Sequence, residues 1–257
     1  MSPDVPGWAG VAASVALVVL AAAITWRERL GVTRELLVAA LRAFVQLVAV
    51  GAVLSFLFAE AGLLGALAWL AAMVAVASVE AARRARGLPG ALRTAATGIG
   101  VGTATTLGIL VVLQVVDTEP RVLVPVGGMV VSGAMQVAAL VLRGLRTTAT
   151  TRRPAVEARL SLGLSAGDAF APYVHETVRT ALIPAIDTTK VVGLISLPGA
   201  MTGLILAGVD PLTAIRYQIV VMYMLLAAAA VTGLVTARVA SRALFDDAQR
   251  LRAVPVP

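Results

Sequence analysis

The sequence predicts an all-α fold, a polytopic membrane helix bundle with about seven transmembrane spans. Hydrophobic residues make up 59% of the 257 positions and charged residues only 14%, compared with about 25% charged residues in ordinary soluble domains. The basic residues lie at the ends of apolar runs, so the net charge of +7 indicates membrane topology and not a nucleic-acid partner. We therefore expect residues 1–257 to form a single transmembrane domain, multi-pass, in the plasma membrane.

The first span is predicted over residues 8–26, which carry no charge. They would form a helix about 28 Å long, enough to cross the hydrocarbon core. Trp8 and Trp26 would anchor its two ends at the interfaces. A cleaved signal peptide would need a basic region before the apolar run, whereas residues 1–7 carry only Asp4, so we interpret this segment as a retained helix.

Six further apolar runs complete the predicted bundle. They cover residues 36–59, 63–82, 94–116, 122–142, 191–208 and 213–237. Of the 21 Lys and Arg residues, 18 follow the first, third, fifth and seventh spans. The positive-inside rule then predicts an N-terminus outside the cell and a C-terminus in the cytoplasm.

The only long polar segment, residues 143–190, is predicted to be cytoplasmic. Residues 147–154 are expected to form a Thr/Arg-rich linker, and an amphipathic helix follows, with Ser165 and Asp168 in the spacing of a capping box. This helix could lie on the inner membrane surface or dock a cytoplasmic partner. Because its polar positions carry charges of both signs, including Glu157, Arg159 and Asp168, the pattern favours the partner.

The stretch at residues 179–208 predicts an interrupted helix. Pro198 removes a backbone donor, and Gly199 and Gly203 leave bare backbone on the surface, so regular helix should fail near Ser196. Irregular backbone at membrane depth survives only beside protein or a water-filled path, which makes residues 196–203 a candidate transport path. The alternative is that the Gly-x-x-x-Gly spacing serves only helix packing, which the local sequence slightly favours.

Polar side chains inside the spans are further path candidates. Arg42 and Gln46 lie one helical turn apart in the second span, where a buried arginine costs about 2.5–3.5 kcal/mol. Arg42 either faces the bundle interior or extends to the cytoplasmic interface. Met201 and Thr202 add a thioether and a hydroxyl to the interrupted span.

The fifth span holds Met129, Ser132, Met135 and Gln136. Ser132 and Gln136 share a helix face, as do Met129 and Ser132, so sulfur and oxygen groups converge on one stripe. Packing is the commoner role of membrane methionines, but these positions could also line a path. With no cysteine and a single histidine, any metal would need oxygen, nitrogen or thioether ligands, and the candidates are Met135, Gln136 and Met201.

Nothing in the sequence resembles a nucleotide-hydrolysing site. The phosphate-binding pattern Gly-x-x-x-x-Gly-Lys-Ser/Thr is absent, so we expect no enzyme activity and no bound cofactor, and any ATP and magnesium would be held by a separate chain. The glycines Gly98, Gly100 and Gly102 fall within a predicted span and indicate close helix packing.

One stretch carries a family resemblance. The sequence IPAIDTTKVVGLISLPGAMTGLILAG at residues 183–208, followed by Tyr217-Gln218-Ile219, resembles the FetB-type membrane subunits of ABC transporters. This family of bacterial iron exporters also includes the plant aluminium-sensitivity membrane protein. The similarity runs from ALRAFVQL at residues 40–47 to residues 242–245.

The resemblance implies a permease subunit of an exporter, two copies of which would work with a separate ATP-binding subunit. It implies iron, or a related small solute, as the cargo, and Asp187 and Lys190 as the inner boundary of the sixth span. It also implies that the cytoplasmic segment couples to the ATP-binding subunit, through Glu157, Arg159, Leu160, Gly163 and Asp168.

The chain departs from the family pattern at positions that could contact cargo. It has Ser132-Gly133-Ala134-Met135-Gln136 where relatives tend to have Gly-Asn-x-Met-Asn, and Leu204 where they tend to have glutamine. Two other functions stay open: a self-sufficient secondary transporter or channel, and a membrane scaffold that transports nothing. The former predicts internal repeats with a second broken helix and a mid-membrane acid, and neither is evident.

Overall fold

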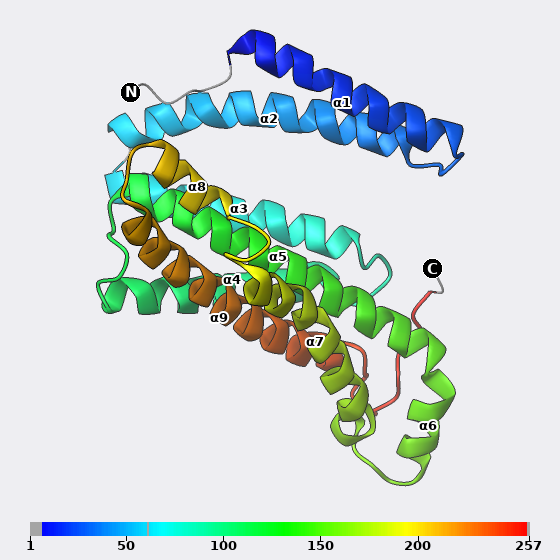
Figure 1. Ribbon diagram of the computed structural model, residues 1–257. Helices are drawn as coiled ribbons and strands as arrows, with labels where there is room; N and C mark the ends of the chain where they lie inside the picture. The colour runs from blue at the N-terminus through cyan, green and yellow to red at the C-terminus, as the bar shows by residue number, and fades with distance from the viewer. Residues whose placement is uncertain (1–6, 61, 256–257) are drawn as a thin grey trace.

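The computed structural model describes residues 7–60 and 62–255, with the backbone alone at residues 52 and 55–60. These ranges are almost entirely helical, which confirms the all-α prediction (Figure 1). In chain order the helices are α1 (Trp8–Arg27), α2 (Thr33–Glu60), α3 (Gly62–Arg83), α4 (Ala91–Val112), α5 (Pro120–Thr151), α6 (Arg153–Ser161), α7 (Ala166–Val191), α8 (Gly199–Leu206) and α9 (Pro211–Ala243).

Five helices of the described chain, α1, α3, α4, α5 and α9, are long and apolar enough to cross a membrane. Their bounds follow the predicted apolar runs, and α1 begins at Trp8 as expected. Helix α2 covers the second predicted span, although the side chains of residues 55–59 lie outside the described residues. The bundle is therefore confirmed, whereas the count of seven spans and the orientation stay predictions.

Helix α5 lies at the centre of the bundle, where it contacts α3, α4, α7 and α9. The expectation of a linker over residues 147–154 is wrong, because α5 continues to Thr151 and α6 begins at Arg153. The hydroxyls of Thr150 and Thr151 are satisfied within the helix, since both donate to the Thr147 carbonyl, at 2.8 and 2.9 Å. Pro154 is tolerated because the first turn of a helix has no intrahelical N–H bond to lose.

Helices α4 and α9 pack at close range through small residues. A Cβ atom added at Gly98 would meet the side chain of Thr236, and one at Gly102 would meet Thr232, with the threonine Cα 3.3 Å away in both cases. Only glycine therefore allows the two backbones to approach this closely, which agrees with the packing interpretation of the glycine motif.

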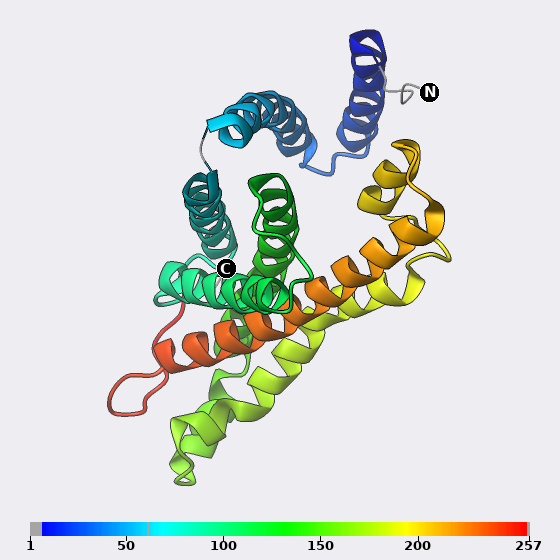
Figure 2. The same ribbon diagram turned by 90° about the vertical axis from the view of Figure 1, so that its left-hand side faces the viewer.

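Helices α1 and α2 stand at the edge of the bundle (Figures 1 and 2). Helix α1 contacts α2 and has no buried residue, and α2 reaches the bundle through α3 and α5. Leu17 and Val19 of α1 are more than half exposed, at 69% and 58%. Apolar residues so placed fit a helix whose surroundings are lipid rather than water.

Helix α7 is longer than predicted. It begins as expected, since the Ser165 hydroxyl accepts a hydrogen bond of 3.2 Å from the backbone N–H of Asp168. It then continues without interruption to Val191, packed along α5 and α9 (Figure 2). Residues 182–190, assigned from sequence to the cytoplasmic segment, therefore lie beside the helices predicted to span the membrane.

The predicted sixth span over residues 191–208 is not a single helix. Residues 192–198 are non-helical, and α8 has eight residues, or about 12 Å of length, too short to cross a membrane. The interruption is thus confirmed but begins earlier than the predicted Ser196 region. Gly193, with φ of +81°, takes a left-handed conformation directly after α7, and Pro198 precedes the first turn of α8.

Candidate transport site

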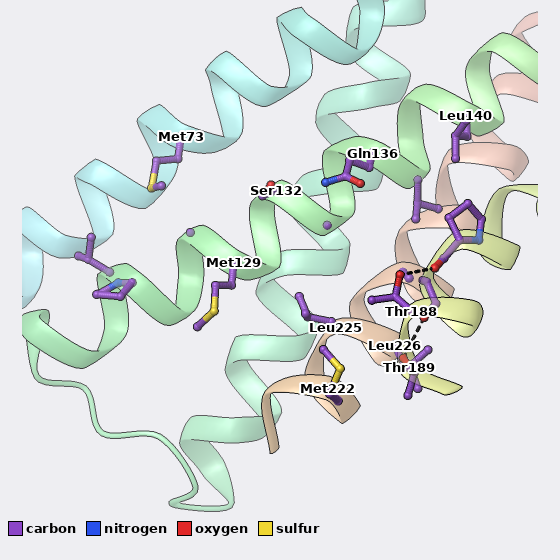
Figure 3. A pocket seen from close by; sticks show the side chains of 18 of the residues that line it. Met73, Met129, Ser132, Gln136, Leu140, Thr188, Thr189, Met222, Leu225 and Leu226 are labelled. Atoms are coloured by element: carbon purple, nitrogen blue, oxygen red, sulfur yellow. Dashed lines mark hydrogen bonds between the residues drawn. The ribbon is translucent and has the colours of Figure 1, made fainter. Parts of the chain in front are cut away.

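A cavity of about 670 Å³ lies where α5, α7 and α9 meet α2 and α3. Helix α5 contributes Met129, Ser132 and Gln136, and α7 contributes Thr188 and Thr189. Figure 3 shows these side chains with Met222 and Leu225 of α9 and Met73 of α3. The volume lies within the range typical of small-molecule sites.

The cavity face of α5 follows from helical spacing. Met129, Ser132 and Gln136 are separated by three and four residues, which places them on one stripe. Gly128 and Gly133 add no bulk beside this stripe, so the space remains open. Three of the four residues predicted in this span therefore lie together, as expected.

Met135, the fourth predicted residue of this span, is placed differently. It is partly buried against the core cluster formed by α3, α4, α5 and α9 and does not line the cavity. One residue along a helix rotates a side chain by about 100°, which separates Met135 from Gln136. The candidate metal set of Met135, Gln136 and Met201 is consequently not brought together.

The wall formed by α7 supplies oxygen atoms. The Thr188 hydroxyl donates to the Pro184 carbonyl and the Thr189 hydroxyl to the Ala185 carbonyl, both at 2.8 Å (Figure 3). Because each hydroxyl hydrogen is used inside the helix, its oxygen is left as an acceptor. The cavity therefore offers acceptor oxygens from α7 opposite the hydroxyl and amide groups of α5.

The interruption after α7 is held by local hydrogen bonds. The N–H of Gly193 donates to the Ser196 carbonyl at 2.9 Å, and the Thr202 hydroxyl donates to the Pro198 carbonyl at 3.2 Å. Ser196 and Thr202 thus organise the turn into α8 and do not line the cavity. Met201, also on α8, is outside the lining as well.

The glycines of α8 have no close neighbour in this chain. A Cβ atom at Gly199 or Gly203 would meet nothing within 4 Å. The packing interpretation of this Gly-x-x-x-Gly spacing therefore finds no partner helix among the described residues.

Arg42 and Gln46 are exposed on α2 and form no hydrogen bond or ion pair with the described residues. Gln46 lies one turn before Val50, which lines the cavity together with Leu54. The two polar residues thus precede the cavity-lining part of α2 along the helix. They do not reach the lining themselves.

Asp187 and Lys190 form an exposed ion pair of 3.2 Å in the last turns of α7. They flank Thr188 and Thr189, which line the cavity. The predicted inner-boundary pair therefore lies next to the candidate site and close to the interruption.

The predicted coupling residues gather around the turn that joins α6 to α7. Gly163, with φ of +86°, forms this turn, where only glycine is unstrained. Arg159 donates to the Asp168 carbonyl at 3.1 Å, and Glu157 pairs with Arg153 at 2.7 Å. Leu160 packs against the core cluster. These residues form one surface at the far end of α7 from the cavity.

Sequence reasoning missed the cavity residues on α3, α7 and α9. The apolar runs place Thr188 and Thr189 in the cytoplasmic segment 143–190, because the next run begins only at residue 191. Pro184 was the available signal, since a proline inside an apolar helix leaves a carbonyl unbonded and often marks a functional kink.

Residues 8–245 match the protein family described as "Uncharacterised protein family (UPF0014)". The chain belongs to the UPF0014 family. The match covers every helix from α1 to α9, including the candidate site and the coupling turn. No solved structure matches the chain.

Three UPF0014 relatives resemble the chain over most of its length. "UPF0014 membrane protein STAR2" of Oryza sativa subsp. japonica is 41% identical over 93% of this chain and 84% of its own. "Protein ALUMINUM SENSITIVE 3" of Arabidopsis thaliana is 36% identical over 94% and 88%. "Probable iron export permease protein FetB" of Escherichia coli (strain K12) is 32% identical over 94% and 93%.

These comparisons confirm the family resemblance and the multi-pass membrane location. One of these relatives is described as a probable iron export permease and another as a membrane protein.

Proposed function

We propose that this UPF0014 protein is the membrane-spanning permease subunit of an ABC exporter in the plasma membrane. It would move an iron-like metal ion or a related small solute out of the cytoplasm. A separate ATP-binding subunit would bind ATP and magnesium and supply the energy, and two copies of the permease would assemble in lipid.

One observation carries the proposal. A cavity of about 670 Å³ with several polar groups lies directly against α7, and the chain loses helical structure immediately after α7. Interrupted backbone beside a cavity is the arrangement that membrane transporters tolerate, because the freed backbone groups then face protein or water. Displacement of α7 and α8 would change access to the cavity.

The coupling turn supports a partner on the cytoplasmic side. Leu162 is 82% exposed and Leu164 is 37% exposed, on either side of Gly163. Beside them Glu157 and Arg159 supply charges of both signs. An apolar pair within a mixed-charge rim resembles the composition of a protein interface more than that of a lipid-binding surface.

The cargo would be bound by uncharged groups. Within the described part of the chain no three His, Cys, Asp or Glu side chains come together as a metal site. The groups available in the cavity are the Ser132 hydroxyl, the Gln136 amide, the threonine oxygens of α7 and the thioethers of Met129 and Met222. These oxygen and thioether groups could contact a metal ion as cargo or hydrogen-bond a small polar solute.

The decisive experiment is purification of the chain from native membranes in mild detergent, followed by an ATPase assay with and without iron. A stoichiometric ATP-binding chain with iron-stimulated hydrolysis is expected. ATP hydrolysis that is stimulated by a small solute but not by iron would support the exporter and identify the solute, instead of iron, as its cargo. A monodisperse protein without such a chain would contradict the proposal and favour a secondary transporter or a scaffold.

The cavity itself is tested by Gln136→Leu, with Met135→Leu as the matched control on the same helix. Gln136→Leu should lower transport roughly tenfold, as expected when about 1.4 kcal/mol of contact with the cargo is lost. Met135→Leu conserves volume in the core and should leave transport near the parent level. Equal transport by the two variants would place the path elsewhere.

A further inference from the structure

The chain beyond α9 folds back as a tight hairpin, residues 244–252, which we call the C-terminal hairpin. The Arg252 N–H donates to the Leu244 carbonyl at 2.8 Å, and Phe245 and Leu251 form an antiparallel bridge. Leu244 is fully buried and Leu251 is 4% exposed. The hairpin is therefore anchored in the core at both of its ends.

The tip of the hairpin is closed by an acid and a base. The Asp246 carboxylate accepts from the backbone N–H of Arg250 at 2.8 Å and from its Nε at 2.9 Å. These hydrogen bonds, the backbone one first, lower the pKa of Asp246. Gln249 takes a positive φ of 57° within this turn.

The hairpin attaches to α6 through Arg153. The guanidinium of Arg153 donates to the carbonyls of Leu251 and Arg252 at 3.0 and 3.2 Å, while its Nε bonds to Glu157 at 2.7 Å. A planar guanidinium can satisfy three acceptors in fixed directions, which lysine cannot do. Arg153 thus fixes the start of α6 to the hairpin.

The hairpin attaches to α7 through Gln249 and Phe245. The Gln249 side-chain oxygen accepts from the N–H of Ala166, the first residue of α7, at 2.8 Å. The Phe245 ring meets the buried Phe170 ring edge to face, with centroids 5.7 Å apart. The hairpin therefore holds both helices that flank Gly163.

The same hairpin is the direct continuation of α9. Helix α9 borders the cavity at Met222, Leu225 and Leu226 and continues without a break to Ala243. From Leu226 to Leu244 the distance along the axis is about 27 Å. The C-terminal hairpin thus connects the coupling turn to a cavity wall without passing through α7.

We propose that the C-terminal hairpin positions the α6–α7 turn and transmits its displacement to α9, with Arg153 and Gln249 as the positioning residues. This inference rests on the proposed function for the identity of the partner, the ATP-binding subunit. A displacement of the turn would then reach the cavity by two routes, α7 on one side and α9 on the other.

The first test needs no partner chain. Hydrogen exchange is measured on the full chain in detergent for the parent and for the double variant Arg153→Ala/Gln249→Ala. Backbone amides of α6 and the first turns of α7 should exchange about tenfold faster in the double variant, the factor that corresponds to 1.4 kcal/mol. Unchanged exchange there would overturn the proposal.

Arg146→Ala is the matched control for this measurement. Arg146 also donates from its guanidinium to a carbonyl of the C-terminal chain, that of Pro255 at 3.3 Å, but it does not touch the α6–α7 turn. Its removal should leave the exchange of α6 unchanged. Equal acceleration by Arg146→Ala would assign the effect to general loosening and overturn the specific role.

The second test measures cargo moved per ATP hydrolysed by the complex with the ATP-binding subunit. The double variant should retain the subunit and its hydrolysis while losing most transport, whereas Arg146→Ala should match the parent. In the triple variant Arg153→Ala/Ala166→Cys/Gln249→Cys, a cross-link between the two thiols, specific because the chain has no native cysteine, should restore the ratio. If the double variant without a cross-link moves as much cargo per ATP as the parent, the hairpin does not transmit the displacement of the turn to α9.

The two tests separate the two proposals. A parent protein that never associates with an ATP-binding chain contradicts the proposed function, whatever the exchange data show. The hairpin's hold on the turn is then still decided by the exchange measurement alone.

Discussion

The two halves of α9 differ in how closely their neighbours approach. In the C-terminal half, Thr232 and Thr236 lie against glycines of α4, and a Cβ at Gly233 would lie 3.2 Å from Val137 of α5. In the N-terminal half, Met222 and Leu225 border a cavity. Both halves are apolar helix with glycines among their neighbours, so the difference comes from what lies beside those glycines. Thr232 and Thr236 fill the space beside the glycines of α4, whereas the space beside Gly128 and Gly133 of α5 is part of the cavity.

Both halves contain buried polar side chains without a hydrogen-bond partner among the described residues, the hydroxyls of Thr232 and Thr236 in the C-terminal half and an amide in the N-terminal half. Gln218, in the N-terminal half, is 4% exposed, and both polar atoms of its side chain are buried without a hydrogen-bond partner among the described residues. Such a group costs stability in an apolar interior. From the difference in packing alone, we infer that the C-terminal half is the fixed part of α9 and that the N-terminal half, which borders the cavity, is the part that rearranges.

The largest effect should come from removing core volume beside the fixed half. Leu145 is fully buried in the cluster that includes Ala240 of α9, and Leu145→Ala should lower the free energy of unfolding by about 2–5 kcal/mol. Leu140→Ala, on the same helix but 41% exposed and lining the cavity, should cost less than about 1 kcal/mol. Thermal unfolding in detergent measures the stability of both variants. Equal losses of stability would show that the core beside the fixed half is packed no more tightly than the cavity wall.

The next effect tests the close contact of α4 with α9. Gly102→Val would force a branched side chain into Thr232 and should cost about 3 kcal/mol, the upper part of the range for overpacking. Gly100→Val, where a Cβ meets nothing within 4 Å, carries the same change in helix propensity without the clash. The difference in melting temperature between these two variants measures the effect of the α4–α9 contact alone. Similar melting temperatures would show that the helices can separate at little cost.

A smaller effect of opposite sign is expected at Gln218. Gln218→Leu should raise the free energy of unfolding by about 1–2 kcal/mol, because it removes a buried amide that has no partner. Gln46→Leu, at an exposed position of α2, should stay within about 0.5 kcal/mol of the parent. Destabilisation by Gln218→Leu would mean that the amide is already paired in the folded protein, and the N-terminal half would then be as fixed as the other.

The smallest effect is expected on α8, which lies beside the N-terminal half. Gly203→Ala should stabilise the isolated chain by less than about 1 kcal/mol, through helix propensity alone, because a Cβ there has open space. Gly98→Ala, which meets Thr236, should destabilise it. Detergent unfolding of both variants gives the comparison. A clear loss of stability in Gly203→Ala would indicate that α8 is packed against a second molecule.

Several local features could be predicted from residues near one another in sequence. The Ser165 cap of α7 was predicted from a four-residue pattern, and Glu80 pairs with Arg83 and Arg84 at 3.9 Å as helical spacing suggests. The interruption before Pro198 followed from the backbone chemistry of proline and glycine. Each of these features depends on interactions within about two helical turns, so residues close together in the sequence are enough to predict it.

The candidate site could be predicted only in part. Helical spacing groups Met129, Ser132 and Gln136 on one stripe and turns Met135 away from Gln136, but it does not say which of the two faces borders a cavity. It also did not group Thr188 with these residues, because the apolar runs assign residues 143–190 to a cytoplasmic segment, whereas Thr188 lines the same cavity. Which helices stand opposite a side chain is information that is not local in the sequence.

The sequence by itself determined that this is a multi-pass helical membrane protein. It also determined the positions at which most helices begin, and it showed that helical structure is interrupted after Val191. Only the tertiary structure decided which stripe of α5 faces the cavity, which glycines are in contact, and that the C-terminal hairpin holds the α6–α7 turn. The physical reason is the apolar surroundings: lipid and neighbouring helices are equally hydrophobic, so apolar periodicity cannot tell one from the other. Close packing and polar contacts between distant segments make that distinction, and these exist only once the helices are assembled.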